Sequence, residues 1–362
     1  MSHIQMQNAV SLLEAENLIA TCGADVTIML VGGMGIGKTS LLWRLAERFK
    51  ATHDPVYVDM TTKDLADLSG VPYIEERGGI KVTHFAPNSE LKFGNNRPVI
   101  VMLDEFGKAM RAVQNTALRL MLEHKMGEHE LPPGSIVFGT TNKTGEGLGD
   151  TIQPHARNRI SFVPVRSPDS EEWCEWAVGN EVEPEVIAWV NQNPQCLASF
   201  DNGGQEENQY IYHPNKPVTA FVTPRSLVKA GMIIKHRGTL GGNATVVGMA
   251  GCVGESAARD MMAYAALADK LPTWESIVRS PETAKLPTAG DAAACFITIY
   301  SALARVEKDT FDQWMIYCQR MEKEFQGVFC CNIVKSSRRA VAMASRSFVL
   351  WATENHWLFD SK

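Results

Sequence analysis

Residues 31–40, VGGMGIGKTS, constrain this chain more than any other stretch of its sequence. Four of the ten are glycine, and a glycine inside regular structure costs roughly 0.5–1 kcal/mol relative to alanine. The stretch ends a short apolar run, DVTIMLVG, which predicts a buried strand, and it precedes LLWRLAERF, whose apolar residues recur at helical spacing. We therefore expect a strand-to-helix connection in which the backbone wraps closely around something.

The spacing of this stretch predicts that the bound group is a phosphate. Gly32, Gly37, Lys38 and Thr39 satisfy G-x-x-x-x-G-K-[ST], the pattern of phosphate-binding loops. In such a loop, backbone N–H groups and a helix N-terminus converge on anionic oxygens, and side chains would block that approach. Lys38 is expected on the β- and γ-phosphates of a nucleotide, and the Thr39 hydroxyl on Mg²⁺. The residues expected around the phosphates are Gly32, Gly33, Met34, Gly35, Ile36, Gly37, Lys38, Thr39 and Ser40.

Two acidic residues end another buried apolar run, VIVMLDEF. A buried carboxylate is costly unless it meets a cation or a hydrogen-bonding partner. Asp104 is therefore expected at the carboxyl edge of the sheet, beside the loop, where it would hold the Mg²⁺ shell. Glu105 would face the γ-phosphate and orient or deprotonate the attacking water. The alternative is a helix-capping pair, which the neighbouring phosphate motif disfavours.

A third candidate, Asn142, ends the apolar run of GSIVFGTTN. Its amide could hold the water against Glu105 without adding charge. Asparagine after a strand is also a common turn residue, so the position gains its meaning from its order in the chain.

Arginines supply the remaining candidates. Arg157 and Arg159 directly precede the run ISFVPV, where one of them could project into a neighbouring subunit's nucleotide site or both could be surface residues. In VTPRSL, Thr223 fits a helix N-cap and Pro224 the first helical position. Arg225 would then stand at a helix start, where it could reach a phosphate or remain solvated.

Buried apolar runs alternate with amphipathic segments as far as Pro164, which is typical of a parallel sheet covered on both faces. The segment VPYIEERGGIKVTHF alternates on both sides of Gly78-Gly79 and predicts a β-hairpin. The short segment TTKDLADLSG begins with two hydroxyl side chains and ends in glycine, which predicts a capped helix. Beyond Arg166 helical periodicity dominates, and the Pro- and Gly-containing stretch 279–291 is a plausible boundary.

Charge and composition exclude several classes of protein. The net charge is −6, from 35 basic and 41 acidic residues, which disfavours a nucleic-acid or anionic-membrane partner. The N-terminal residues lack the pattern of a signal peptide, and the longest apolar stretch is too polar to span a bilayer. None of the eight cysteines forms a CxxC pair or a zinc-like spacing, so we expect reduced, mostly buried thiols and a cytoplasmic location.

Taken in order, these motifs resemble those of AAA+ ATPases. Gly32 to Thr39 is similar to Walker A, Asp104-Glu105 to Walker B and Asn142 to sensor 1. TTKDLADLSGVPY, GEHELPPGSIVFGTTN and TPRS are similar to segments of the MoxR and dynein-related branch. The resemblance makes Arg225 the expected sensor 2 and Arg159 the expected arginine finger, although HARNRI departs from the branch's usual pattern and Arg157 competes for that role.

The resemblance implies an α/β fold, a P-loop NTPase parallel sheet with helices on both faces, then an α-helical lid and a C-terminal helical segment. The expected domains are an ATPase domain at 1–166, a lid carrying sensor 2 at 167–280 and a helical extension at 281–362. It also implies ATP hydrolysis with Mg²⁺ in a homo-oligomeric ring, a hexamer, that remodels a protein client such as a von Willebrand factor A domain protein.

Two other function classes remain open from the sequence. One is a DNA-acting AAA+ protein resembling a helicase loader or clamp loader, for which KSSRRAVAMASR is the best basic segment. The other is a non-catalytic, nucleotide-switched scaffold, which the presence of Glu105 and Asn142 argues against. Salt-dependent DNA binding would separate the first from a protein remodeller, and phosphate release would exclude the second.

Overall fold

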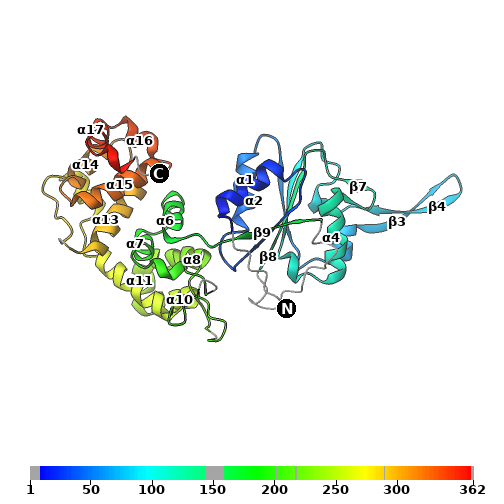
Figure 1. The fold of residues 1–362 in the computed structure, drawn as a ribbon, viewed down its shortest axis with the longest axis horizontal. Coiled ribbons are helices and arrows are strands. Elements are labelled where there is room, and N and C mark those ends of the chain that lie inside the picture. The colour runs from blue at the N-terminus through cyan, green and yellow to red at the C-terminus, as the bar shows by residue number, and fades with distance from the viewer. Residues whose placement is uncertain (1–8, 143–158, 201–202, 217, 289, 360–362) are drawn as a thin grey trace. The chain divides into compact units, whose positions relative to one another are not determined.

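The structure is a computed structural model that describes residues 9–142, 159–200, 203–216, 218–288 and 290–359. It divides into two compact units, Met1–Ser167 and Pro168–Lys362 (Figure 1). The first unit contains the strands and the second is helical. Each unit is described by itself below.

The first unit is built on a five-stranded parallel sheet in the order β2-β5-β8-β1-β9. In chain order of these five strands the arrangement is 2-3-4-1-5, which is the sheet of P-loop NTPases, so the predicted fold class is confirmed. The strands are β1 (Ile28–Gly32), β2 (Asp54–Asp59), β5 (Val99–Asp104), β8 (Ile136–Thr141) and β9 (Ser161–Val165).

Alternate residues of the three inner strands, β1, β5 and β8, enter two separate cores, one on each face of the sheet. On one face Leu30 and Met102 pack with residues of α1 (Leu12–Cys22) and α2 (Ser40–Arg48). On the other face Met29 and Leu103 pack with residues of α3 (Leu65–Ser69) and α4 (Arg111–Glu123). This two-sided burial explains why the strands are apolar along their whole length rather than alternating.

The sequence signals locate α3 but not its cap. Asp64, rather than one of the preceding threonines, is the N-cap, and its carboxylate accepts from the Asp67 N–H at 2.9 Å. The threonines are already used in the turn after β2, where Thr61 N–H and Oγ1 donate to Asp59 Oδ1 at 3.0 and 2.7 Å. The helix begins at Leu65, so the N-cap position falls on Asp64, beyond the threonines.

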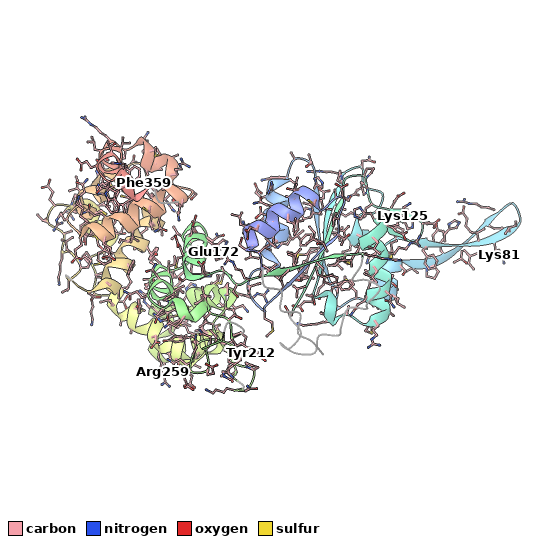
Figure 2. The ribbon with its side chains drawn as sticks, viewed as in Figure 1. Lys81, Lys125, Glu172, Tyr212, Arg259 and Phe359 are labelled. Atoms are coloured by element: carbon pink, nitrogen blue, oxygen red, sulfur yellow. The ribbon has the colours of Figure 1, made fainter. Side chains whose placement is uncertain are left out.

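A long two-stranded ribbon leaves this unit between α3 and β5. It consists of β3 (Val71–Arg77) and β4 (Ile80–Ala86), paired from Val71↔Ala86 to Arg77↔Ile80. Gly78 and Gly79 have φ of 60° and 80°, the left-handed values that a two-residue hairpin turn requires, so the predicted hairpin is confirmed. Figures 1 and 2 show the ribbon extending beyond α4, with Lys81 near its tip.

Smaller elements complete the first unit. A minimal hairpin precedes β8, and short 3-10 turns flank β5. These elements are β6 (Lys125–Met126), β7 (His129–Glu130), η1 (Ser89–Leu91) and η2 (Phe106–Lys108).

The second unit is helical throughout its described residues and has one core, which contains buried residues from Trp173 to Trp351. The division expected at 280/281 runs through that core and stays a prediction. Its elements are α6 (Ser170–Gly179), α7 (Pro184–Gln192), η3 (Pro194–Leu197), α8 (Pro224–Lys235), α9 (Arg237–Leu240), α10 (Gly242–Val253), α11 (Glu255–Ala268), α12 (Trp274–Arg279), α13 (Ala292–Arg305), α14 (Phe311–Cys318), α15 (Lys323–Lys335), α16 (Arg339–Ala344), α17 (Arg346–Glu354) and η5 (His356–Leu358).

The cysteines are free thiols, as expected. Burial raises the pKa of the Cys174 and Cys318 thiols to about 12, so both stay protonated and behave as small apolar groups. Within the part of the chain that the structure describes, no helix combines the length and apolar character needed to cross a bilayer.

Candidate active site

The glycine-rich loop runs from the end of β1 to the start of α2, as its sequence predicts. Two of its glycines have positive φ, 70° at Gly35 and 108° at Gly37. A Cβ at Gly32 would lie 2.7 Å from the Ile36 side chain and 2.9 Å from the Val165 carbonyl oxygen. Glycine is therefore required in this loop for both backbone conformation and close packing.

Lys38 is folded into this loop and is only 6% exposed. Its Nζ donates to the carbonyl oxygens of Gly32 and Gly33, both at 2.7 Å, and to Asn142 Oδ1 at 2.9 Å. The buried ammonium is thus supplied with hydrogen-bond acceptors, as its desolvation requires. The contact with Asn142 joins the loop to the end of β8.

Asp104, at the end of β5, is 6% exposed and accepts hydrogen bonds from several segments. Thr39 Oγ1 and the Tyr57 hydroxyl donate to Oδ2 at 3.0 and 3.1 Å. Thr140 Oγ1 and the Glu105 backbone N–H donate to Oδ1, the latter at 3.2 Å. The carboxylate is consequently held in one orientation by donors from the residue before α2, from β2 and from β8.

The strand register explains this convergence. Asp104 is in register with Asp59 of β2, and its predecessor Leu103 is in register with Gly139 of β8, so Thr140 continues alongside Asp104. Tyr57, two residues before Asp59, shares the sheet face of Asp104 because side chains alternate along a strand. Burial, reinforced by the nearby Asp104 charge, raises the pKa of Tyr57 to about 12, so its hydroxyl is a hydrogen-bond donor at neutral pH.

Glu105 has left-handed backbone geometry, with φ of 55°, which is uncommon for a residue with a side chain. Its carboxylate accepts from Asn142 Nδ2 at 3.2 and 3.3 Å. It also pairs with Lys108 Nζ at 2.7 Å. The backbone turn therefore directs this carboxylate toward Asn142 rather than along the strand.

The arrangement brings the loop, Asp104, Glu105 and Asn142 to the carboxyl edge of one sheet. A helix N-terminus and a lysine beside it can neutralise phosphate charge. The Thr39 hydroxyl and the Asp104 carboxylate, 3.0 Å apart, are the oxygen donors that Mg²⁺ prefers, so this pair fits a magnesium site. Glu105 and Asn142 supply a carboxylate and an amide that could jointly hold a water.

The arginines are placed differently. Arg159 is exposed and precedes β9, whose first residue, Ser161, is in register with Ile28. Ser161 therefore lies at the amino edge of the sheet, four strand residues before the level of Gly32 and roughly 13 Å from the loop along the strand direction, and Arg159 precedes it by two residues. Arg157 lies outside the described residues. Whether Arg157 or Arg159 is the arginine finger therefore stays a prediction.

Arg225 belongs to the second unit. Thr223 caps α8 with its hydroxyl, which accepts from the Ser226 N–H at 3.0 Å, and Pro224 occupies the first turn, as predicted. Arg225 follows on that turn and is exposed. Its expected contact with a phosphate stays a prediction.

Sequence reasoning missed Tyr57, Thr140 and Lys108. The first two share a sheet face with Asp104, but only the strand order and register reveal it. Lys108 follows Glu105 by three residues, and this spacing could have indicated the ion pair had the turn η2 been foreseen.

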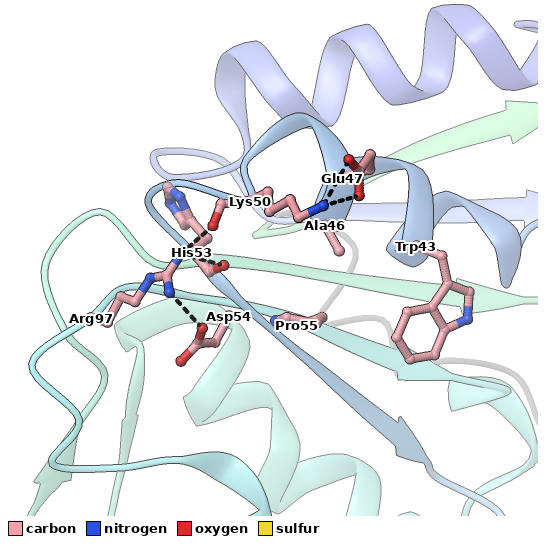
Figure 3. Close-up of a pocket in the computed structure, with 8 residues that line it drawn as sticks. All are labelled: Trp43, Ala46, Glu47, Lys50, His53, Asp54, Pro55 and Arg97. Atoms are coloured by element: carbon pink, nitrogen blue, oxygen red, sulfur yellow. Dashed lines mark hydrogen bonds and ion pairs between the residues drawn. The ribbon is translucent and has the colours of Figure 1, made fainter.

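A separate hollow of about 440 Å³ lies between α2 and the start of β2 (Figure 3). Its charged groups are paired with one another, Lys50 with Glu47 at 3.2 Å and Arg97 with Asp54 at 3.3 Å. Asp54 begins β2, so the hollow is at the amino edge of the sheet and does not coincide with the candidate site. The residues lining it are Trp43, Ala46, Glu47, Lys50, His53, Asp54, Pro55 and Arg97.

Neither a protein-family model nor a curated protein matches this sequence. Among solved structures, a protein of Cytophaga hutchinsonii described as a candidate ATPase is 19% identical with a TM-score of 0.34, covering 47% of this chain. This chain spans 50% of that protein's length. NtrX of Brucella abortus in complex with ATP is 14% identical with a TM-score of 0.35, covering 94% of this chain and 69% of its own. Likenesses this distant assign no function, so the functional argument rests on the sheet order and the site residues of this chain.

Proposed function

We propose that this chain is an AAA+ ATPase of the MoxR and dynein-related kind, which hydrolyses ATP with Mg²⁺ to remodel a protein partner. The observation that carries the ATPase half is the convergence of three separate segments at one sheet edge. They contribute Lys38 and Thr39, Asp104, Glu105 and Asn142, joined by hydrogen bonds of 2.9–3.3 Å. Each of these residues has a distinct part in phosphoryl transfer.

In this proposal ATP occupies the loop with its β- and γ-phosphates on the backbone N–H groups and on Lys38. Lys38 exchanges at least one of its present oxygen acceptors for a phosphate oxygen. Bound at Thr39 and Asp104, Mg²⁺ would supply charge that offsets the build-up on the phosphate oxygens. Glu105 then accepts a proton from the attacking water, which Asn142 holds in place.

The position of Arg159 supports the proposal of a ring. Phosphoryl transfer gains 10³-fold or more from an arginine at the γ-phosphate. Arg159 is at the opposite edge of the sheet from the loop of its own unit, and β9 is an outer strand of that sheet. In the proposed assembly, a homo-oligomeric ring and most simply a hexamer, this exposed arginine serves the nucleotide of the neighbouring copy.

The proposal of a protein partner is supported by the β3–β4 ribbon. Large apolar side chains are exposed along it, among them Val71, Ile74 and Ile80 at 64%, 70% and 68%. Val71 and Ile80 lie on one face of the ribbon and Ile74 on the other, and exposed apolar surface commonly marks a protein-binding site. The partner class implied by the resemblance is a von Willebrand factor A domain protein.

The ATPase proposal is tested with Glu105→Gln, which keeps the side chain's shape but removes the carboxylate. We expect phosphate release to fall roughly 10²-fold or more, the usual contribution of a positioned base, while ATP affinity measured by calorimetry is retained. The wild-type protein and Glu130→Gln are the controls, since Glu130 is an exposed residue of β7. Wild-type turnover in Glu105→Gln would move the base elsewhere, and absence of turnover in the wild-type protein would reject the ATPase itself.

A further inference from the structure

Tyr57 is an aromatic residue on the outer strand β2, and its side chain has two different ends. The residue is 38% exposed, yet its hydroxyl donates to Asp104 Oδ2 at 3.1 Å. The neighbouring strand residues Val56 and Val58 are buried on the other face of the sheet. The Tyr57 hydroxyl is thus directed at the site, while part of its ring stays in solvent.

Asp104 Oδ2 is the oxygen that faces the candidate magnesium position, because it also accepts from Thr39 Oγ1 at 3.0 Å. The other oxygen, Oδ1, is held from behind by Thr140 and the Glu105 N–H. Two donors thus fix the rear oxygen, whereas the front oxygen depends on Thr39 and Tyr57. Thr39 is itself expected to ligate the cation, which leaves Tyr57 as the donor whose sole evident role is orientation.

We propose that Tyr57 is a positioning residue for Mg²⁺, whose hydroxyl keeps Asp104 Oδ2 turned toward Thr39. The inference rests on the proposed function, since it concerns the same nucleotide site. A hydrogen bond to a charged group contributes more than one between neutral groups, so its loss is expected to weaken Mg²⁺ binding about tenfold or more. Nucleotide contacts that need no cation are left in place.

The test uses Tyr57→Phe, which removes one oxygen and keeps the ring. Its matched control is Tyr73→Phe, the same change at a 49% exposed tyrosine on the β3–β4 ribbon. The affinity for ATP is measured by calorimetry, once in excess EDTA and then across a titration of MgCl₂. We expect Tyr57→Phe to match the wild-type protein in EDTA and to need about tenfold more Mg²⁺ for half of the cation-dependent gain in affinity. Tyr73→Phe should match the wild-type protein throughout.

The outcomes separate this inference from the proposed function. If the wild-type protein binds ATP with a Mg²⁺-dependent gain and Tyr57→Phe shows the same titration, the positioning role is overturned. Equal weakening of Tyr57→Phe in EDTA and in Mg²⁺ also overturns it, because the residue would then act on the nucleotide or on the fold. If the wild-type protein itself shows no ATP binding, the proposed function fails before Tyr57 is in question.

Discussion

The carboxyl edge of the sheet and the β3–β4 ribbon both depart from the usual burial of apolar side chains and exposure of charged ones. The sheet edge buries charged side chains, and the ribbon exposes apolar ones. At the sheet edge Lys38 and Asp104 are charged and each 6% exposed. On the ribbon Ile74 and Ile80 are apolar and 70% and 68% exposed. A buried charge costs stability unless polar partners compensate it, and exposed apolar surface commonly marks a binding site. Under the proposed function, the comparison separates small-molecule chemistry at the edge from contact with a protein partner on the ribbon.

The largest expected effect tests whether catalysis at the sheet edge needs Arg159 of a second copy of the chain. We expect Arg159→Ala to lower turnover about 10³-fold and to leave ATP affinity unchanged, because the arginine would act only on the transition state of a neighbouring site. Arg119→Ala is the control, since Arg119 forms an exposed pair with Glu123 on α4. Phosphate release and calorimetry measure the two quantities.

Mixing variants sharpens that prediction. Lys38→Ala lacks a working loop but keeps Arg159, whereas Arg159→Ala has the reverse defect, so mixed rings should recover part of the ATPase rate. No recovery in mixtures whose mixed assembly is demonstrated would contradict a shared site. Full activity of Arg159→Ala together with loss of activity in Arg157→Ala would move the shared arginine by two residues.

A second prediction separates the ribbon from the chemistry. Replacing Glu76–Lys81 by Asn-Gly should preserve the remaining pairing, because Glu75 and Val82 are in register and can be joined by a two-residue turn. We expect basal phosphate release within about twofold of the wild-type rate, as for changes at the surface, but loss of work on the protein partner. The control is Glu76→Gln with Lys81→Gln, which keeps the ribbon's length. Unfolding of the shortened protein would instead make the ribbon part of the core structure.

The smallest expected effect is on the free energy of unfolding at an exposed isoleucine of the ribbon, measured against a buried isoleucine of the sheet. Ile74→Ala on the ribbon should change the free energy of unfolding by no more than about 0.5 kcal/mol, because the side chain is already in solvent. Ile100→Ala in β5 should cost about 2–5 kcal/mol, because that side chain is fully buried beneath α1 and α2. Denaturant titration of the first unit's transition measures both. Similar losses at the two positions would mean that the ribbon is packed against something in the isolated protein.

Much of the fold and of the site was predictable from local signals. The apolar runs located the strands, and the glycine spacing located the loop around Lys38, because both are properties of short segments. Asp104 and Asn142 could be placed at one edge because parallel strands end together. Helix α10 was less visible, since Gly242, Gly248 and Gly251 lower helix propensity and its helical state depends on packing within the second unit.

The missing parts depend on relations between distant segments. Tyr57 and Thr140 reach Asp104 only because β2 and β8 flank β5, and strand order is a long-range property. The left-handed backbone at Glu105 is a second example, because nothing in the letters DEF requires it. Asp64 as the cap of α3 is a third, since the sequence also offered the preceding threonines and did not locate the helix start at Leu65.

The hydrogen bonds of Asn142 restrict which side chains could occupy its position, because one bond is accepted and the other is donated. Its oxygen accepts from the Lys38 ammonium while its nitrogen donates to the Glu105 carboxylate, so the two ends of one short amide face opposite charges. Aspartate has the same length and would still attract the lysine, but its second oxygen would repel the glutamate. Leucine has similar volume and would satisfy neither, and a hydroxyl is too short to span both. The position thus requires a side chain with a hydrogen-bond acceptor at one tip and a hydrogen-bond donor at the other.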